Sequence, residues 1–205
     1  MTEFFNSSDW DQYWEADKGG GSSIQKVISK FRKHFDNEYV KLITSLTPSN
    51  DAKILEVGCG TGYGTHKLGD MGYTSFALDY SPRATIFWDR ESANFFIADG
   101  FHIPFKSDSF DLVWNAGVLE HFPDPQPMIR EMIRVCRPGG TVCIIVPYIF
   151  DILAYLKVAG EENIFTKKKL KNELKELDDV GIKVLYTCAG MLISGWGRKS
   201  NEIEV

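Results

Sequence analysis

The apolar positions of the chain form short runs that alternate with stretches of helical spacing. Helical spacing fills the stretch that ends near Met71, the one that begins at Ser81, and the one from Met128 to Cys136. Strands that alternate with helices predict a mostly parallel sheet with helices on both faces. The apolar runs typical of buried strands occupy 53–57, 76–79, 95–98, 110–114 and 141–146.

Start and stop signals bound several of the helices. Ser81 followed by Pro82 predicts a helix start, because serine caps a first turn and proline suits its first position. The letters PGG at 138–140 are expected to end the helix before the fifth strand. Thr166 is expected to cap a later helix.

The two ends of the chain depart from this alternation. Residues 1–21 are polar and aromatic and finish in three glycines, which predicts a flexible aromatic lid. Residues 22–47 carry the apolar stripes of N-terminal helices. Residues 148–205 hold a looser apolar segment, one helix and two last strands joined tightly enough to be antiparallel. We therefore expect a single domain around a core at 53–147.

Composition narrows the class of protein. A length of 205 residues allows one domain with a substantial core, and 43% hydrophobic with 25% charged residues is ordinary globular composition. The net charge of −5 does not favour nucleic acid as a partner, so we expect a small molecule instead. No apolar run approaches the ~20 residues of a membrane span, and no leader sequence is visible, so we expect a cytoplasmic protein. The sequence leaves the oligomeric state open.

The glycines that follow the first strand are the most informative feature. Gly58, Gly60 and Gly62 stand where a parallel sheet binds ligands, and glycine lets a ligand lie against the main chain. A dinucleotide turn has the spacing G-x-G-x-x-G, which would require a third glycine at Tyr63. Asp79 ends the second strand and is placed to accept hydrogen bonds from ribose hydroxyls, although helix electrostatics beside Ser81 also explains it.

Six motifs follow one another along the core: ILEVGCGTG at 54–62, LDYSP at 78–82, ADGFHIPF at 98–105, FDLVWN at 110–115, VLEH at 118–121 and RVCRPGG at 134–140. Together they resemble the class I S-adenosylmethionine-dependent methyltransferases. The resemblance covers residues 54–147 in order, and is closest to the branch of ubiquinone and menaquinone biosynthesis methyltransferases. It implies an α/β fold with a Rossmann-like doubly wound sheet of about seven strands. The sheet would be mostly parallel with an antiparallel last strand, under an N-terminal helical lid.

The resemblance also implies a role for individual residues. The core 53–147 would bind S-adenosylmethionine, whose product is S-adenosylhomocysteine, and 148–205 would supply the acceptor-side segment. Aromatic residues in the lid would close over the cofactor. The implied contacts are Gly58, Cys59, Gly60 and Gly62 with methionine and ribose, Glu56 with the loop or the methionine amino group, Asp79 with the ribose hydroxyls, Tyr80, Asp99, Gly100 and Phe101 with adenine, the Asn115 carbonyl with the methionine amino group, and Tyr13 and Trp14 as the closing rings.

His121 is the candidate catalytic base, because it follows the fourth strand and imidazole titrates near neutrality. Its alternative role is a hydrogen bond within the loop. Some family members hold a metal with Glu-x-x-Glu-His, but Gly117 stands where the first glutamate would be. The four cysteines show no metal-ligand spacing, so we expect no metal.

The sequence does not identify the methyl acceptor. The apolar letters YIFDILAYLKVAG at 148–160 favour a small, partly hydrophobic molecule. A protein or tRNA methyltransferase is one alternative, and a catalytically idle S-adenosylmethionine-binding regulatory domain is another.

Overall fold

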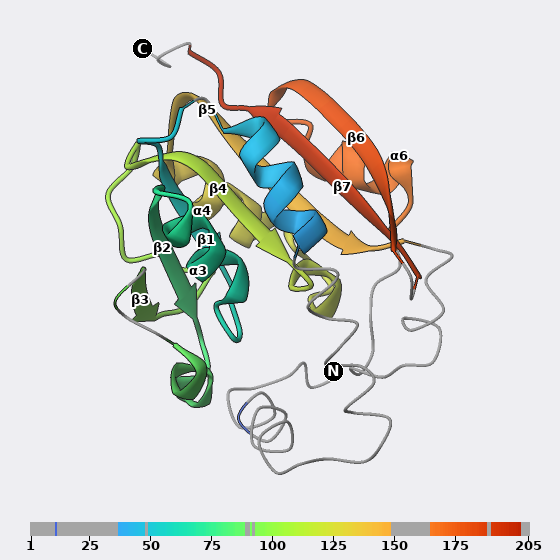
Figure 1. Ribbon diagram of the computed structural model, residues 1–205. Coiled ribbons are helices and arrows are strands. Elements are labelled where there is room, and N and C mark those ends of the chain that lie inside the picture. Colours follow the sequence, from blue (N-terminus) through green and yellow to red (C-terminus); the bar gives the residue numbers. More distant parts are fainter. Residues whose placement is uncertain are drawn as a thin grey trace.

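A computed structural model describes residues 11, 37–47, 49–88, 91, 93–148, 165–187 and 190–201. Its centre is a seven-stranded sheet in the order β3-β2-β1-β4-β5-β7-β6 (Figure 1). The strands are β1 (Lys53–Val57), β2 (Thr74–Asp79), β3 (Asn94–Ile97), β4 (Phe110–Ala116), β5 (Cys136–Pro147), β6 (Asp178–Thr187) and β7 (Gly190–Arg198).

Strand direction confirms the expected sheet. The five strands β1 to β5 pair in parallel, whereas β7 runs antiparallel to both β5 and β6. The order of the strands reverses between β1 and β4: β2 and β3 follow β1 on one side, and β5 follows β4 on the other. In open sheets of this kind, ligands bind at the carboxyl ends of the strands beside that switch point.

Helices cover both faces of the sheet. The helix at 37–46 and α3 (Tyr63–Asp70) pack on one face, where Ile43 and Leu68 join the same buried cluster as Trp114. On the other face, α4 (Gln126–Val135) and α6 (Lys167–Glu173) pack against Val113 and its neighbours. In Figure 1 the 37–46 helix lies in front of the sheet and α6 lies behind β6 and β7. The doubly wound architecture is therefore confirmed.

Two local expectations need correction. The stretch after Ser81 is a 3-10 helix, η1 (Pro82–Phe87), although Ser81 does cap it by accepting a hydrogen bond from the Arg83 amide. Residues 138–140 do not separate α4 from the fifth strand, because α4 ends at Val135 and β5 begins at once. Backbone hydrogen bonds from Gly139 to Lys199 and from Lys199 back to Gly140 hold this stretch extended.

The later capping prediction is confirmed. The Thr166 hydroxyl accepts a hydrogen bond from the Lys169 amide, 3.1 Å away, at the start of α6. Phe165 and Leu170 are both fully buried in the same cluster, as a hydrophobic staple requires. Of the expected N-terminal helices at 22–47, residues 22–36 lie outside the described residues, as does all of the expected lid at 1–21 except residue 11. No helix among the described ranges is long and apolar enough to cross a membrane.

Candidate functional site

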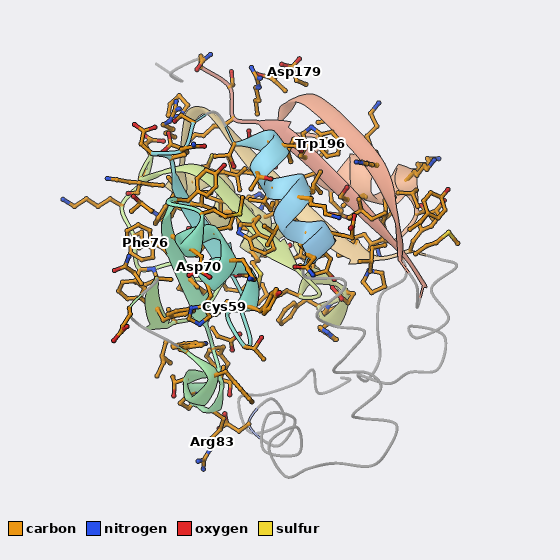
Figure 2. The ribbon with its side chains drawn as sticks, in the orientation of Figure 1. Cys59, Asp70, Phe76, Arg83, Asp179 and Trp196 are labelled. Carbon is orange, nitrogen blue, oxygen red and sulfur yellow. The ribbon has the colours of Figure 1, made fainter. Side chains whose placement is uncertain are left out.

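The glycine loop after β1 adopts a left-handed backbone conformation that residues with a side chain rarely adopt. Gly58, Gly60 and Gly62 have φ values of 75°, 50° and 72°. The amides of Gly58 and Cys59 donate to the Leu78 carbonyl at 2.8 and 3.0 Å, which ties the loop to the end of β2. Figure 2 labels Cys59 at this end of the sheet, with Arg83 beyond it at η1. The loop thus presents main chain rather than side chains at the switch point.

Asp79 fixes both the glycine loop and the segment after β2. Its Oδ2 accepts from the Gly60 amide at 2.7 Å, and its Oδ1 accepts from the Ser81 amide at 2.9 Å. Burial raises the pKa of the Asp79 carboxyl, against the opposing effect of hydrogen bonds from the Ser81, Gly60 and Tyr80 amides and with a small contribution from Asp11. A carboxylate oxygen accepts more than one hydrogen bond, so each retains acceptor capacity.

Glu56 supports the helix that follows the loop. Its buried carboxylate accepts hydrogen bonds from the Thr65 hydroxyl and from the Thr65 amide, the latter at 3.0 Å. Gly64 is needed beside this pair, because a Cβ there would lie 2.7 Å from the Trp114 ring. The first turn of α3 is therefore held against β1 and β4.

A third strand end brings Asp99 to the same edge. Asp99 Oδ1 accepts from the Phe101 amide at 2.9 Å, and its Oδ2 lies 3.0 Å from Nδ1 of the exposed His102. Gly100 is buried against α4, since a Cβ there would lie 3.0 Å from both Met128 and Val57. The turn therefore presents backbone groups and one carboxylate.

A charged clamp holds the Asp99 turn onto α4. The Arg134 guanidinium donates to the Ile103 and Phe105 carbonyls, each at 2.9 Å, and to the Glu131 carboxylate. Glu131 in turn accepts from the Ile103 amide at 2.9 Å. These hydrogen bonds fix the turn relative to the sheet.

Tyr80 and Asn115 complete the described part of the expected site. Tyr80 directly follows Asp79 and is 51% exposed, so its ring is available to a ligand. Asn115 is fully buried near the end of β4, where its Nδ2 lies 3.6 Å from the Met132 sulfur. Tyr13 and Trp14 lie outside the described residues.

Sequence reasoning missed two contacts at this edge. The Ser81 hydroxyl donates to the Asp11 carboxylate, which brings one residue of the N-terminal segment beside Asp79. The Trp88 indole donates to the Gly60 carbonyl at 2.8 Å. An aromatic residue after Ser81-Pro82 was visible in the sequence, but no local pattern connects it with a loop 28 residues earlier.

The part of the chain that forms this site matches a known protein family. Residues 55–144 match the methyltransferase domain family, and this range contains the glycine loop, Asp79, the Asp99 turn and Asn115. The matched range is a methyltransferase domain of the class I S-adenosylmethionine-dependent type.

Two curated relatives illustrate the match of this chain. Methyltransferase GfsG of Streptomyces halstedii is 32% identical over 144 residues, which are 64% of this chain and 52% of that protein. The demethylmenaquinone methyltransferase of Corynebacterium urealyticum is 33% identical over 92 residues, which are 45% of this chain and 40% of that protein. The chain spans about half the length of these relatives. The resemblance to quinone methyltransferases is confirmed at this level.

A solved structure agrees with the fold. The complex between the Haloferax volcanii Trm112 methyltransferase activator and a methyltransferase contains a chain that matches with a TM-score of 0.76 at 18% identity. The match covers 97% of this chain and 99% of that chain. At this identity the likeness concerns the fold.

His121, the candidate base, is a buried side chain. It lies in η2 (Leu119–His121) and is only 5% exposed. Burial lowers the pKa of His121 from 6.5 to about 4, because the charged ring would lose its hydration. The expectation of titration near neutrality is therefore wrong, because burial holds this ring neutral at pH values near 7.

The buried imidazole should destabilise the folded protein in acid. Between the folded pKa of about 4 and the unfolded pKa of about 6.5, the unfolded state binds more protons. The free energy of unfolding should therefore fall by up to roughly 3 kcal/mol as the pH drops through that window. Urea unfolding at several pH values tests this: His121→Gln should lose most of the dependence, and the exposed His102→Gln should keep it. If the free energy of unfolding of His121→Gln depended as steeply on pH as that of the wild type, His121 would not be the cause of the dependence.

Among the described residues, no group of three or more His, Cys, Asp or Glu side chains is placed to hold a metal ion. The buried thiols of Cys59, Cys136 and Cys143 are also poor metal ligands, because burial raises the pKa of each above its ordinary value.

Proposed function

We propose that this chain transfers the methyl group of S-adenosylmethionine to a small, partly hydrophobic acceptor. The observation that carries the proposal is the joint anchoring of the glycine loop by Asp79 and by the end of β2 at the switch point of the sheet. That arrangement places the main chain of the glycine loop beside a partly buried carboxylate with spare acceptor capacity. Both are what a ribose linked to an amino acid requires.

The residues fit this cofactor in chemical type. Asp79 would accept from the ribose hydroxyls, and the half-exposed Tyr80 ring would lie against adenine. Asp99 would accept from the adenine amino group, and the Gly100 and Phe101 backbone would face the ring edge. Gly58, Cys59, Gly60 and Gly62 would pack against the methionine and ribose parts. Glu56 would act by supporting the loop through Thr65, and the Asn115 carbonyl would face the methionine amino group.

The chemistry that bound S-adenosylmethionine supplies is an activated methyl group on a positively charged sulfur. The protein's task is to align the acceptor and exclude water, which together contribute ~7–11 kcal/mol when the geometry is good. A base is needed only when the acceptor arrives protonated. His121 is our candidate for that base, and as a neutral ring with a pKa of about 4 it would impose no pH dependence near neutrality.

Tyr148 and Phe165 bound the segment that we propose lies on the acceptor side. Tyr148 follows β5 at the carboxyl edge and pairs in a β-bridge with Phe165, which brings the two ends of the 148–165 segment together. Residues 149–164, whose apolar letters suggested a hydrophobic acceptor, lie outside the described residues. The experiment is a screen of quinols, phenols and amines with S-adenosylmethionine. Mass spectrometry would look for a product heavier by one methylene group.

The two alternatives give different results in the same screen. Retained cofactor affinity without turnover across the panel would favour an idle regulatory domain. Turnover only with a protein or tRNA added to the panel would favour a macromolecular methyltransferase. Methylation of a small acceptor supports the proposal.

We also propose that the N-terminal segment closes over the cofactor. Within residues 1–36 the structure describes Asp11 alone, and its carboxylate accepts from Ser81, whose amide donates to Asp79. Deletion of residues 1–20 should weaken S-adenosylhomocysteine binding about tenfold or more while the melting temperature changes little. Calorimetry and thermal unfolding measure the two quantities. A large fall in melting temperature without ligand would show instead that the segment completes the core.

A further inference from the structure

We propose that Trp88 is a positioning residue that holds the glycine loop in its cofactor-binding shape, an inference that rests on the proposed function. Trp88 stands at the end of η1, and its indole Nε1 donates to the Gly60 carbonyl at 2.8 Å. The Gly60 amide donates to Asp79 on the other side, at 2.7 Å. The main chain at Gly60 is therefore held at both its N–H and its C=O, each by a side chain from the β2–η1 segment.

The indole is itself held in place by a ring from the next strand. Trp88 stacks on Phe95 of β3 with ring centroids 4.9 Å apart and an interplanar angle of 17°. Phe95 belongs to a small buried cluster with Cys59, Ala77 and Ala93, and Trp88 packs against that cluster. Because Cys59 is part of the glycine loop, the two rings support the loop by packing against it as well as through the hydrogen bond.

The same two rings also set the space available at the end of the loop. A Cβ on Gly62 would lie 2.5 Å from the Phe95 ring and 3.3 Å from Trp88 Cδ1. The loop therefore lies in direct contact with the Trp88–Phe95 stack. A displacement of the indole would leave the Gly60 carbonyl, among the described residues, with only the weak Cys59 thiol contact and would also open space beside Gly62.

The arrangement separates two tasks in the β2–η1 segment. Asp79 faces the proposed ribose position and is a binding residue, whereas Trp88 acts on the loop and needs no contact with the ligand. A hydrogen bond between a neutral N–H and a carbonyl contributes modestly, but a buried carbonyl left with the weak Cys59 thiol contact, 3.9 Å away, costs more. Loss of the indole N–H should therefore lower cofactor affinity through a less ordered loop.

The test compares Trp88→Phe with Trp196→Phe. The first substitution keeps an aromatic ring against Phe95 and removes the N–H donor; the second makes the same change in β7, where Trp196 pairs with Cys143. Calorimetry should give a Kd for S-adenosylhomocysteine about 3- to 15-fold higher in Trp88→Phe and unchanged in Trp196→Phe. If the wild type does not bind S-adenosylhomocysteine, the proposed function fails; if it binds and Trp88→Phe binds equally well, only the positioning role fails.

A spectroscopic readout distinguishes positioning from simple stability. In protein labelled with nitrogen-15, the indole signal that disappears in Trp88→Phe should shift on addition of S-adenosylhomocysteine, and the Trp196 signal should not. If Trp88→Phe does not fold, Phe95→Leu keeps the donor but loosens the stack, and should raise the Kd in the same direction. A stationary Trp88 signal, or a Phe95→Leu variant of wild-type affinity, would overturn the proposal.

Discussion

An Asp79→Ala variant should bind S-adenosylhomocysteine about 5- to 150-fold more weakly than the wild type. The carboxylate is the proposed acceptor for the ribose hydroxyls, and its loss leaves those donors unmatched at a cost of ~1–3 kcal/mol, with ~1.4 kcal/mol for each decade. The same substitution frees the Gly60 and Ser81 amides, which Asp79 now binds at 2.7 and 2.9 Å. Both effects act in the same direction, and calorimetry measures their sum.

Asp111→Ala is the matched control for Asp79→Ala. Asp111 is also a carboxylate that accepts from a backbone amide, that of Lys53 at 2.8 Å, and it accepts from Arg137 as well. It stands at the amino ends of the strands, away from the glycine loop. Asp111→Ala should lower stability and leave the affinity for S-adenosylhomocysteine unchanged. Wild-type affinity in a folded Asp79→Ala variant would remove Asp79 from the cofactor site.

The second large effect is expected for Gly62→Ala, measured against Gly72→Ala. Both glycines have left-handed backbones, with φ of 72° and 95°, so an alanine at either costs about 1–2 kcal/mol. A Cβ on Gly72 meets nothing within 4 Å, whereas on Gly62 it would lie 2.5 Å from the Phe95 ring. Because Phe95 is stacked on Trp88, the overlap should add about 1–3 kcal/mol.

Urea unfolding and calorimetry separate the two glycine variants. Gly62→Ala should lose both stability and affinity for S-adenosylhomocysteine, and Gly72→Ala should lose only the smaller amount of stability. Equal losses of stability in the two variants would show that the Phe95 ring moves aside without cost. Unchanged affinity in Gly62→Ala would show that the shape of the loop is not important for binding.

The sheet could be predicted because its determinants are local. Each buried strand is a short apolar run, and the turn after β1 requires glycine at positions with positive φ. Asp79 follows from the position of an acidic residue at a strand end. These signals lie within a few residues of the structure that they specify.

The parts that could not be predicted depend on contacts between distant residues. Asp11 reaches Ser81 across 70 residues, and Trp88 reaches Gly60 across 28, without any periodic pattern. The extended path through Gly139 depends on pairing with Lys199 near the other end of the chain. The pKa of His121 depends on burial, which the residue type alone does not reveal.

The most direct test of the cofactor site is a calorimetric titration of the wild-type chain with S-adenosylhomocysteine, repeated in the presence of saturating NAD. The Gly58, Gly60 and Gly62 spacing does not match a dinucleotide turn, so NAD should not compete. We expect saturable binding at a single site, with an affinity that NAD leaves unchanged. Absence of binding, or displacement of S-adenosylhomocysteine by NAD, would contradict the assignment of this end of the sheet.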